Sequence, residues 1–125
     1  MEKEIITSKQ RFTVTPTDTA AHLGSGSLEV LATPRLVAMM ESAACAALEG
    51  QLPEEDTSVG VRIDIQHLAA SAVGADVEVI ATLTSREARH LHFSIEATSA
   101  GTLIGRATHD RVIVNANRFM DKLSS

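Results

Sequence analysis

The chain has 125 residues, which suits one domain spanning residues 1–125, since domains most often have about 100–150 residues. Its hydrophobic fraction of 44% supplies a core and excludes wholesale disorder. Its net charge of −5 and its aromatic fraction of 2% argue against nucleic-acid partners, because neither a basic face nor a platform of stacking rings is available. The single cysteine excludes an internal disulfide and a multi-cysteine zinc site.

No segment of the sequence has the pattern of a secretion signal or of a membrane span. The first six residues include three charges and lack a long apolar stretch. The most apolar run, residues 36–48, is interrupted by Glu41 and is shorter than the roughly 20 residues that a helix needs to cross a bilayer. We therefore expect a cytoplasmic protein without a membrane partner.

The sequence before residue 33 predicts a short strand and a loop. Phe12 and Val14 alternate with polar neighbours, which favours a strand at residues 11–14. Residues 24–27, Gly-Ser-Gly-Ser, predict a loop. They do not make a dinucleotide-binding loop, because that motif needs a third glycine and a preceding strand.

Thr33 and Pro34 predict the start of one long helix, since threonine is a good N-cap and proline suits the first helical position. Apolar residues then recur at every fourth position and predict a buried stripe of Leu36, Met40, Ala44 and Leu48. Cys45 lies beside this stripe and is expected to pack in the core as a small apolar residue. Gly50 and Pro53 predict the end of the helix.

The sequence after Pro53 predicts only strands. Alternating apolar and polar side chains mark four of them, at residues 61–67, 76–83, 91–97 and 103–115, with a hairpin turn at residues 100–102. One face of the first is expected to carry Val61, Ile63, Ile65 and His67. Strands joined by short turns after a single helix predict an α+β fold, in which the helix packs against one face of an antiparallel sheet.

Glu41 is the only acidic residue of the helix between Arg35 and Glu49. One interpretation places it in solvent, on the polar side of the helix. The other is a carboxylate held in an apolar cleft, where desolvation disfavours the anion unless hydrogen bonds compensate, which suits a base or a nucleophile. The sequence leaves both interpretations open.

His67 and Thr33 also admit two interpretations each. A lone histidine on an apolar strand face is more often a satisfied core residue than a functional group. The structural role of Thr33 is the N-cap, and its functional role would be a hydroxyl at the positive end of a helix, where an oxyanion or a carboxylate is stabilised.

Two more polar groups interrupt the predicted strands. His90 and His92 lie two residues apart and therefore on one face, as two metal ligands do, but no third ligand is close in sequence. We expect a solvated face there, no metal and no cofactor. His109, Asp110 and Arg111 interrupt the last strand and are candidates for an interface or a ligand contact.

Three segments stand at a distinctive spacing. They are residues 33–41, then Val59-Gly60-Val61 with His67, and residues 105–111, Gly-Arg-Ala-Thr-His-Asp-Arg. Thr33 precedes Glu41 by eight residues and His67 follows Glu41 by twenty-six. In these features the chain, from about residue 11 to about residue 122, resembles the fluoroacetyl-CoA thioesterase-like branch of the hotdog-fold superfamily.

The resemblance implies a hotdog fold, an antiparallel sheet wrapped around one long helix, and a homodimer or higher oligomer with sites at the interface. It implies hydrolysis of an acyl-CoA thioester to a carboxylate and free coenzyme A. Catalytic roles carry over to Thr33, Glu41 and His67. Gly60 takes the position near the substrate carbonyl, and Arg111 that of the arginine in the last strand.

The segment before the helix departs from that branch, whose fluoroacetyl-specific member carries phenylalanines in a lid. Residues 23–32 contain no aromatic side chain. We therefore expect a short or medium acyl chain without fluorine discrimination, and lid contacts from Leu28, Val30 and Leu31.

The resemblance suggests a mechanism in which Glu41 attacks the carbonyl or deprotonates water. His67 orients Glu41 or the water and assists thiolate departure, and Thr33 bonds the carboxylate or the carbonyl oxygen. The alternative function is a non-catalytic hotdog module that binds acyl-CoA or another small hydrophobic ligand. Such a binder has no chemical reason to keep these three residues at this spacing.

Overall fold

A computed structural model describes residues 5–124 and confirms the α+β architecture. Its elements in chain order are β1 (Thr7–Thr13), η1 (Pro16–Asp18), α1 (Ala20–Leu23), α2 (Thr33–Ala47), β2 (Asp56–His67), β3 (Asp76–Glu87), β4 (His90–Ser99), β5 (Thr102–Asn115) and α3 (Ala116–Leu123). The predicted loop at residues 24–27 and the hairpin turn before β5 are both confirmed. The first strand is longer than predicted and begins four residues earlier.

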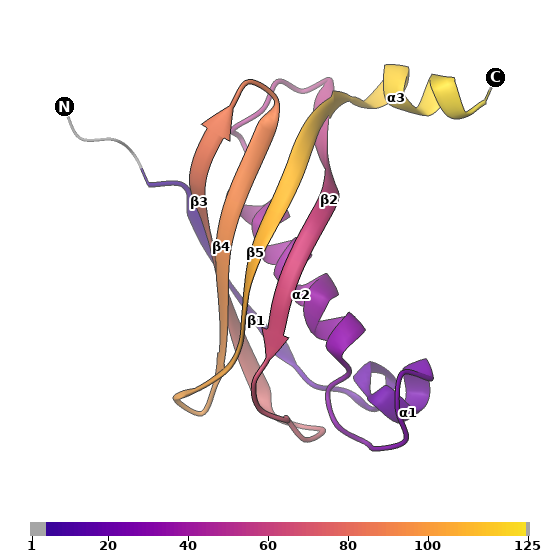
Figure 1. Cartoon of the computed structure of the whole chain (residues 1–125), viewed down its shortest axis with the longest axis vertical. Coiled ribbons are helices and arrows are strands. Elements are labelled where there is room, and N and C mark those ends of the chain that lie inside the picture. Colours follow the sequence, from indigo (N-terminus) through magenta and orange to yellow (C-terminus); the bar gives the residue numbers. More distant parts are fainter. Residues whose placement is uncertain (1–4, 125) are drawn as a thin grey trace.

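The strands form one antiparallel sheet in the order β1-β3-β4-β5-β2, so that β1 and β2 are its edges. Helix α2 crosses one face of this sheet, and α3 extends away from the end of β5 (Figure 1). The inner face buries the alternating apolar residues of β3 and β4, including Val77, Val79, Leu91 and Ile95, each 0% exposed. No helix among residues 5–124 is long and apolar enough to cross a membrane.

Helix α2 buries a wider face than the predicted stripe, because Met39 and Ala43 join Leu36, Met40 and Ala44 at 0% exposure. Each fully buried Leu or Met side chain contributes roughly 1.5–3 kcal/mol to folding. The prediction for Cys45 is wrong, since its side chain is exposed. Cys45 lies on the opposite side of the helix from the residues that face the sheet.

The prediction that Thr33 caps the helix is also wrong. The N-cap is Ala32, whose carbonyl accepts the first helical bond from the Leu36 amide at 3.0 Å. The amide of Ala32 donates a hydrogen bond to the Asp18 carbonyl, which holds this residue in place. The helix therefore begins one residue earlier than predicted. Thr33 is the first helical residue, so its hydroxyl is not used for capping.

A salt bridge anchors this helix start to the preceding segment. Arg35 Nε lies 2.8 Å from Asp18 Oδ1, and the Arg35 guanidinium sits 5.8 Å above the Phe12 ring. Burial tends to raise the pKa of Asp18, but hydrogen bonds from Thr15 and the Arg35 charge outweigh it and hold the pKa below its ordinary value. The carboxylate therefore stays ionised and keeps η1 tied to α2.

A β-bulge changes which residues of β2 face the helix. Gly60 pairs with Arg111 and Arg62 pairs with Asp110, so that Val61 has no partner on β5. Val61 is 58% exposed, and its predicted inward orientation is wrong. Because the bulge shifts the alternation by one residue, Gly60 faces inward together with Ile63, Ile65 and His67.

The prediction that only strands follow Pro53 is wrong, because the chain ends in helix α3. The side chain of Asn115 accepts a hydrogen bond from the Arg118 amide at 3.0 Å and caps this helix. Phe119, Met120 and Leu123 remain exposed on it. The start of this helix was not predicted because the apolar run at residues 112–114 continues the strand pattern up to Asn115.

Candidate active site

The structure brings Thr33 and His67 together at the first turn of α2. Thr33 Oγ1 lies 2.8 Å from His67 Nδ1, which makes a hydrogen bond between the start of the helix and the last residue of β2. His67 Nε2 is buried and has no hydrogen-bond partner within the described residues. A buried polar atom without a partner is costly, so this nitrogen marks a place where a bound molecule can supply the missing bond.

Burial lowers the pKa of His67 below its ordinary value of 6.5, because the apolar surroundings disfavour the imidazolium ion. The nearby backbone of Ala69 opposes this effect without reversing it. The ring is therefore neutral at pH 7, with one nitrogen protonated and the other carrying a lone pair.

A cavity of about 380 Å³ lies beside this pair, and both residues line it. Its apolar walls include Val30, Leu31 and Leu68. Two of the three expected lid residues are thus at the cavity, although Leu31 is 2% exposed and belongs to the core. Leu28 is 68% exposed and is not among the residues that line this cavity.

Glu41 lies in a separate cluster, two turns further along α2. Its Oε2 atom is 3.4 Å from Arg111 Nη1 and 4.0 Å from His109 Nε2. The side chain of Glu41 is 40% exposed, so neither the buried nor the fully solvated interpretation describes it. It is a half-exposed carboxylate whose inner oxygen faces a buried cation.

Gly60 provides the space for that carboxylate. A Cβ atom at this position would lie 2.5 Å from Glu41 Oε2, and 3.2 Å from both Arg111 Nη1 and the His109 ring. Any side chain at residue 60 therefore displaces the carboxylate. Glu41, Gly60 and Arg111, which the resemblance assigned to the site, are neighbours in the structure.

The guanidinium of Arg111 is held from several directions. Its Nε donates to Ser58 Oγ at 2.8 Å, and its Nη2 donates to the Ser58 carbonyl at 3.0 Å. Its Nη1 bonds Glu41 at 3.4 Å and His109 Nε2 at 3.2 Å. The Arg111 side chain is only 7% exposed, so these bonds compensate the desolvation of the charge.

His109 is the buried member of this cluster, at 1% exposure. Burial and the Arg111 charge lower its pKa below 6.5, and they outweigh its bond to the Arg62 backbone and the charges of Glu41 and Asp110. Its Nδ1 lies 2.8 Å from the Arg62 carbonyl, so Nδ1 carries the hydrogen and donates it. The Nε2 lone pair then accepts from Arg111, and His109 and Glu41 do not form an ion pair.

The two clusters are not in contact within one chain. Thr33 and Glu41 are separated by eight helical residues, which correspond to roughly 12 Å along the axis. Glu41 is therefore not within hydrogen-bond distance of Thr33 in the same chain. The expectation that His67 orients Glu41 has no direct contact to support it within a single protomer.

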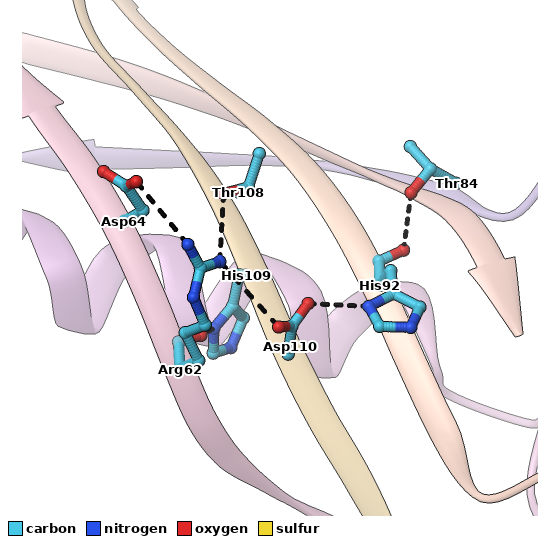
Figure 2. Close-up of polar contacts among 7 residues, drawn as sticks. All are labelled: Arg62, Asp64, Thr84, His92, Thr108, His109 and Asp110. Carbon is cyan, nitrogen blue, oxygen red and sulfur yellow. Dashed lines mark hydrogen bonds and ion pairs between the residues drawn. The ribbon is translucent and has the colours of Figure 1, made fainter. Parts of the chain in front are cut away.

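The outer face of the sheet carries a different polar group (Figure 2). Arg62 lies 3.6 Å from Asp64 and 3.8 Å from Asp110, and Asp110 Oδ1 lies 2.7 Å from His92 Nδ1. These side chains are partly exposed and on the opposite face from Arg111. No group of three or more potential metal-ligating residues occurs in the described part of the chain.

The sequence marked all but one of the residues in the two clusters as candidates. His109 was a candidate for an interface or a ligand contact, and its position two residues from Arg111 on a strand puts both on one face. Ser58 gave no signal, because only the fold shows that it binds Arg111. The bulge at Val61 had no recognisable signal either.

A five-stranded antiparallel sheet that wraps one long helix defines this chain as a hotdog-fold protein. The crystal structure of the fluoroacetyl-CoA thioesterase FlK has this fold and superposes with a TM-score of 0.90, at 30% identity, over 99% of this chain and 96% of that one. A Thermus thermophilus protein described as a thioesterase superfamily member superposes with a TM-score of 0.89 at 26% identity, over 98% of this chain and 90% of that one.

Sequence comparison defines the family more closely. The family model of the fluoroacetyl-CoA-specific thioesterase FlK matches residues 14–117. The fluoroacetyl-CoA thioesterase of Streptantibioticus cattleyicolor is 34% identical over 118 residues, which cover 90% of this chain and 85% of that protein. The chain belongs to the FlK thioesterase family.

Proposed function

We propose that this protein hydrolyses short or medium acyl-CoA thioesters to a carboxylate and free coenzyme A. The observation that carries the proposal is the Thr33–His67 hydrogen bond of 2.8 Å beside a cavity with apolar walls, where His67 Nε2 has no partner in the described part of the chain. Family membership supports thioester chemistry, since structures of two FlK variants are known, one in complex with acetyl-CoA and the other with fluoroacetate and CoA. No aromatic side chain lines the cavity, which favours a plain acyl chain over a fluorinated one.

Glu41, His67 and Thr33 each have a separate role in this reaction, and Glu41 acts on the carbonyl carbon or on the attacking water. Glu41 either deprotonates the attacking water or attacks the carbonyl carbon itself, in which case water hydrolyses the resulting anhydride. In both versions a tetrahedral oxyanion collapses, the C–S bond breaks, and coenzyme A leaves as a thiolate that takes up a proton. Arg111 holds the carboxylate in position, and Gly60 leaves the space that the carboxylate occupies.

His67 and Thr33 serve the other side of the thioester. With the hydrogen of His67 on Nδ1, that nitrogen donates to Thr33 Oγ1, and the Thr33 hydroxyl hydrogen is free to bond the carbonyl oxygen. The Nε2 lone pair then accepts a hydrogen bond from the water molecule. The lowered pKa keeps this lone pair available at pH 7.

A homodimer completes the site in this proposal. Strand β2 is an edge with its outer side unpaired, and the solvent face of α2 carries the small exposed residues Ala38, Ser42 and Cys45. A second copy that packs there about a two-fold axis runs antiparallel to the first. Glu41 of one protomer then meets the Thr33–His67 pair of its partner, which removes the separation of roughly 12 Å.

A subunit-mixing experiment tests the composition of the site. The Glu41→Gln and Thr33→Ala variants are each expected to lose most of their activity. Refolding them together should restore activity, because each heterodimer then contains one intact site. No recovery, in a mixture shown by mass spectrometry to contain heterodimers, would contradict a site shared between protomers.

A panel of acyl-CoAs tests the activity itself. Thiol release is measured with a thiol-reactive dye for short, medium and aryl chains, and light scattering gives the mass in solution. We expect the fastest hydrolysis with short or medium chains, and a dimer mass. Absence of thiol release above background with every substrate would leave a non-catalytic ligand-binding module as the function.

A further inference from the structure

A second cavity, of about 200 Å³, lies between helix α3 and the end of β5. Three of the seven residues that line it are basic, namely Arg89, Arg118 and Lys122, and none is acidic. The whole chain has a net charge of −5, and three other cavities of the described chain are lined by acidic residues, so this cavity contrasts with its surroundings. Its charge suits a ligand with several negative charges.

The basic residues at this cavity differ from five of those elsewhere in the described chain, although Arg86 and Arg106 likewise make no ion pair there. Lys9, Arg11, Arg35, Arg62 and Arg111 all lie within 4.0 Å of a carboxylate oxygen. By contrast, Arg89 donates to the Ile113 carbonyl at 3.2 Å, and the Arg118 guanidinium makes no ion pair with any described residue. Both guanidinium groups thus retain donors for a phosphate.

The cavity also presents an aromatic ring. Of the three phenylalanines in the chain, Phe93 is 2% exposed in the core and Phe12 lies under Arg35. Phe119 lines this cavity and is 39% exposed. An exposed ring beside guanidinium groups suits a base that stacks while its phosphates are bound.

The position of the cavity relates it to the catalytic cluster. Arg111 and Asn115, which borders the cavity, are four residues apart on β5, which corresponds to about 13 Å at roughly 3.3 Å per residue. The pantetheine arm of coenzyme A is roughly as long as four residues of extended chain, about 14 Å. A thioester beside Glu41 therefore places the nucleotide of coenzyme A within reach of α3.

We infer that the α3 cavity binds the adenosine 3′,5′-bisphosphate portion of the acyl-CoA substrate, with phosphates on Arg89 and Arg118 and adenine against Phe119. This inference rests on the proposed function for its substrate. Binding energy from the nucleotide, which does not react, holds the thioester at Glu41 and lowers the KM.

Arg118→Ala is the principal test, with Arg86→Ala as the matched control. Arg86 is an exposed arginine on β3 that does not line the cavity. For acyl-CoA, Arg118→Ala should raise the KM about tenfold with kcat nearly unchanged, since a charged hydrogen bond to phosphate is lost. For the same acyl group on pantetheine, which lacks the nucleotide, Arg118→Ala and the parent should have equal kinetics.

Direct binding provides a readout independent of catalysis. Calorimetry with adenosine 3′,5′-bisphosphate should show binding to the parent and to Arg86→Ala, and about tenfold weaker binding to Arg118→Ala. Phe119→Leu should weaken binding of the bisphosphate but not of inorganic pyrophosphate, which distinguishes a nucleotide site from a general phosphate site.

The outcomes separate this inference from the proposed function. Failure of hydrolysis together with bisphosphate binding that needs Arg118 would overturn the function and support the nucleotide site. Hydrolysis with an unchanged acyl-CoA KM and unchanged bisphosphate affinity in Arg118→Ala would overturn the nucleotide site alone. Equal weakening of bisphosphate and pyrophosphate by Phe119→Leu would contradict the assignment of adenine to that ring.

Discussion

The two clusters on the inner face are built in opposite ways. The Thr33–His67 pair has one hydrogen bond, no formal charge and one buried nitrogen without a partner among residues 5–124. The cluster around Glu41 contains a carboxylate and a guanidinium, and the guanidinium of Arg111 has contacts with Ser58, His109 and Glu41. The first is incomplete without a bound molecule, whereas the second is nearly complete in the free protein.

The two clusters differ in the energetic cost of leaving a group without a partner. A charge on an inner face needs fixed partners, since an unpaired buried ion is destabilising by several kcal/mol. A neutral pair can leave one atom unsatisfied at a cost of about 1–3 kcal/mol, which substrate or water then recovers. In the proposed mechanism, the Thr33–His67 pair therefore sets the binding geometry, whereas the Glu41 cluster holds the charge.

The largest effect is expected from Glu41→Gln. Loss of the charge should lower turnover at least about 100-fold, the lower end of general-base contributions. The melting temperature should change little, because the half-exposed amide keeps an oxygen that accepts from Arg111. Turnover and melting are measured on one sample, and a folded variant with near-parent turnover would exclude Glu41 as the catalytic carboxylate.

Substitutions at the neutral pair should have a somewhat smaller effect. Thr33→Ala is expected to lower turnover about 10–100-fold, and Thr33→Ser should recover most of it because the hydroxyl remains. Since Thr33 is not the N-cap, Thr33→Ala should cost less than the roughly 1 kcal/mol typical of a lost cap. Chemical denaturation measures this cost, and a loss of about 1 kcal/mol or more would indicate that the hydroxyl does stabilise the helix start.

Gly60→Ala tests the space around the carboxylate. The new Cβ should push Glu41 Oε2 outward and lower turnover about tenfold, because small displacements of a reacting group are expensive. Stability should be nearly preserved, since the displaced group is the end of a flexible side chain. Val61→Ala, one residue further along and exposed, is the control that should leave turnover unchanged. Equal kinetics of the two variants would show that Glu41 needs no such space.

The smallest effect concerns pH. His67 and His109 have pKa values below 6.5 in the folded state, so the unfolded chain binds protons first as the pH falls. The free energy of unfolding should therefore decrease below about pH 6.5 and recover above it. The lowered pKa of Asp18 acts in a more acidic range, below its ordinary value of 3.8, and does not contribute at pH 5.5.

His109→Gln separates the two histidines in that measurement. Its side-chain oxygen can accept from Arg111 as Nε2 does, but it does not titrate. Urea denaturation at pH 7.5 and at pH 5.5 should show a smaller loss for this variant than for the parent. An identical loss would mean that His109 does not contribute to the pH dependence.

Much of the fold followed from local pattern. The four-residue apolar recurrence from Leu36 and the alternation around Val77 and Phe93 were enough for α2 and the inner face of the sheet. Helix α3 was missed because the apolar strand pattern of residues 112–114 runs directly into Asn115. Its signal was available, since asparagine is a preferred N-cap.

The site was predictable as a set of residues but not as two clusters. Gly60 and His67 are seven residues apart, and strict alternation puts them on opposite faces of a strand. They share the inner face only because Val61 forms a bulge, and no residue near Val61 in the sequence predicts a bulge. Likewise, the bonds from Arg111 to Ser58 depend on the pairing of β2 with β5.

The bulge also indicates where the protein can tolerate the insertion or deletion of a residue. Val61 behaves as one inserted residue that the sheet has absorbed by turning it out to solvent, at an edge strand with a neighbour on one side only. Strand β5 has neighbours on both sides and carries Asp110 outward and Arg111 inward. If a single codon is lost or gained between residues 105 and 113, the side chains beyond that point move to the opposite face of the sheet. Length variants of this protein should accordingly accumulate in the turns and at β2, while β5 evolves by substitution alone.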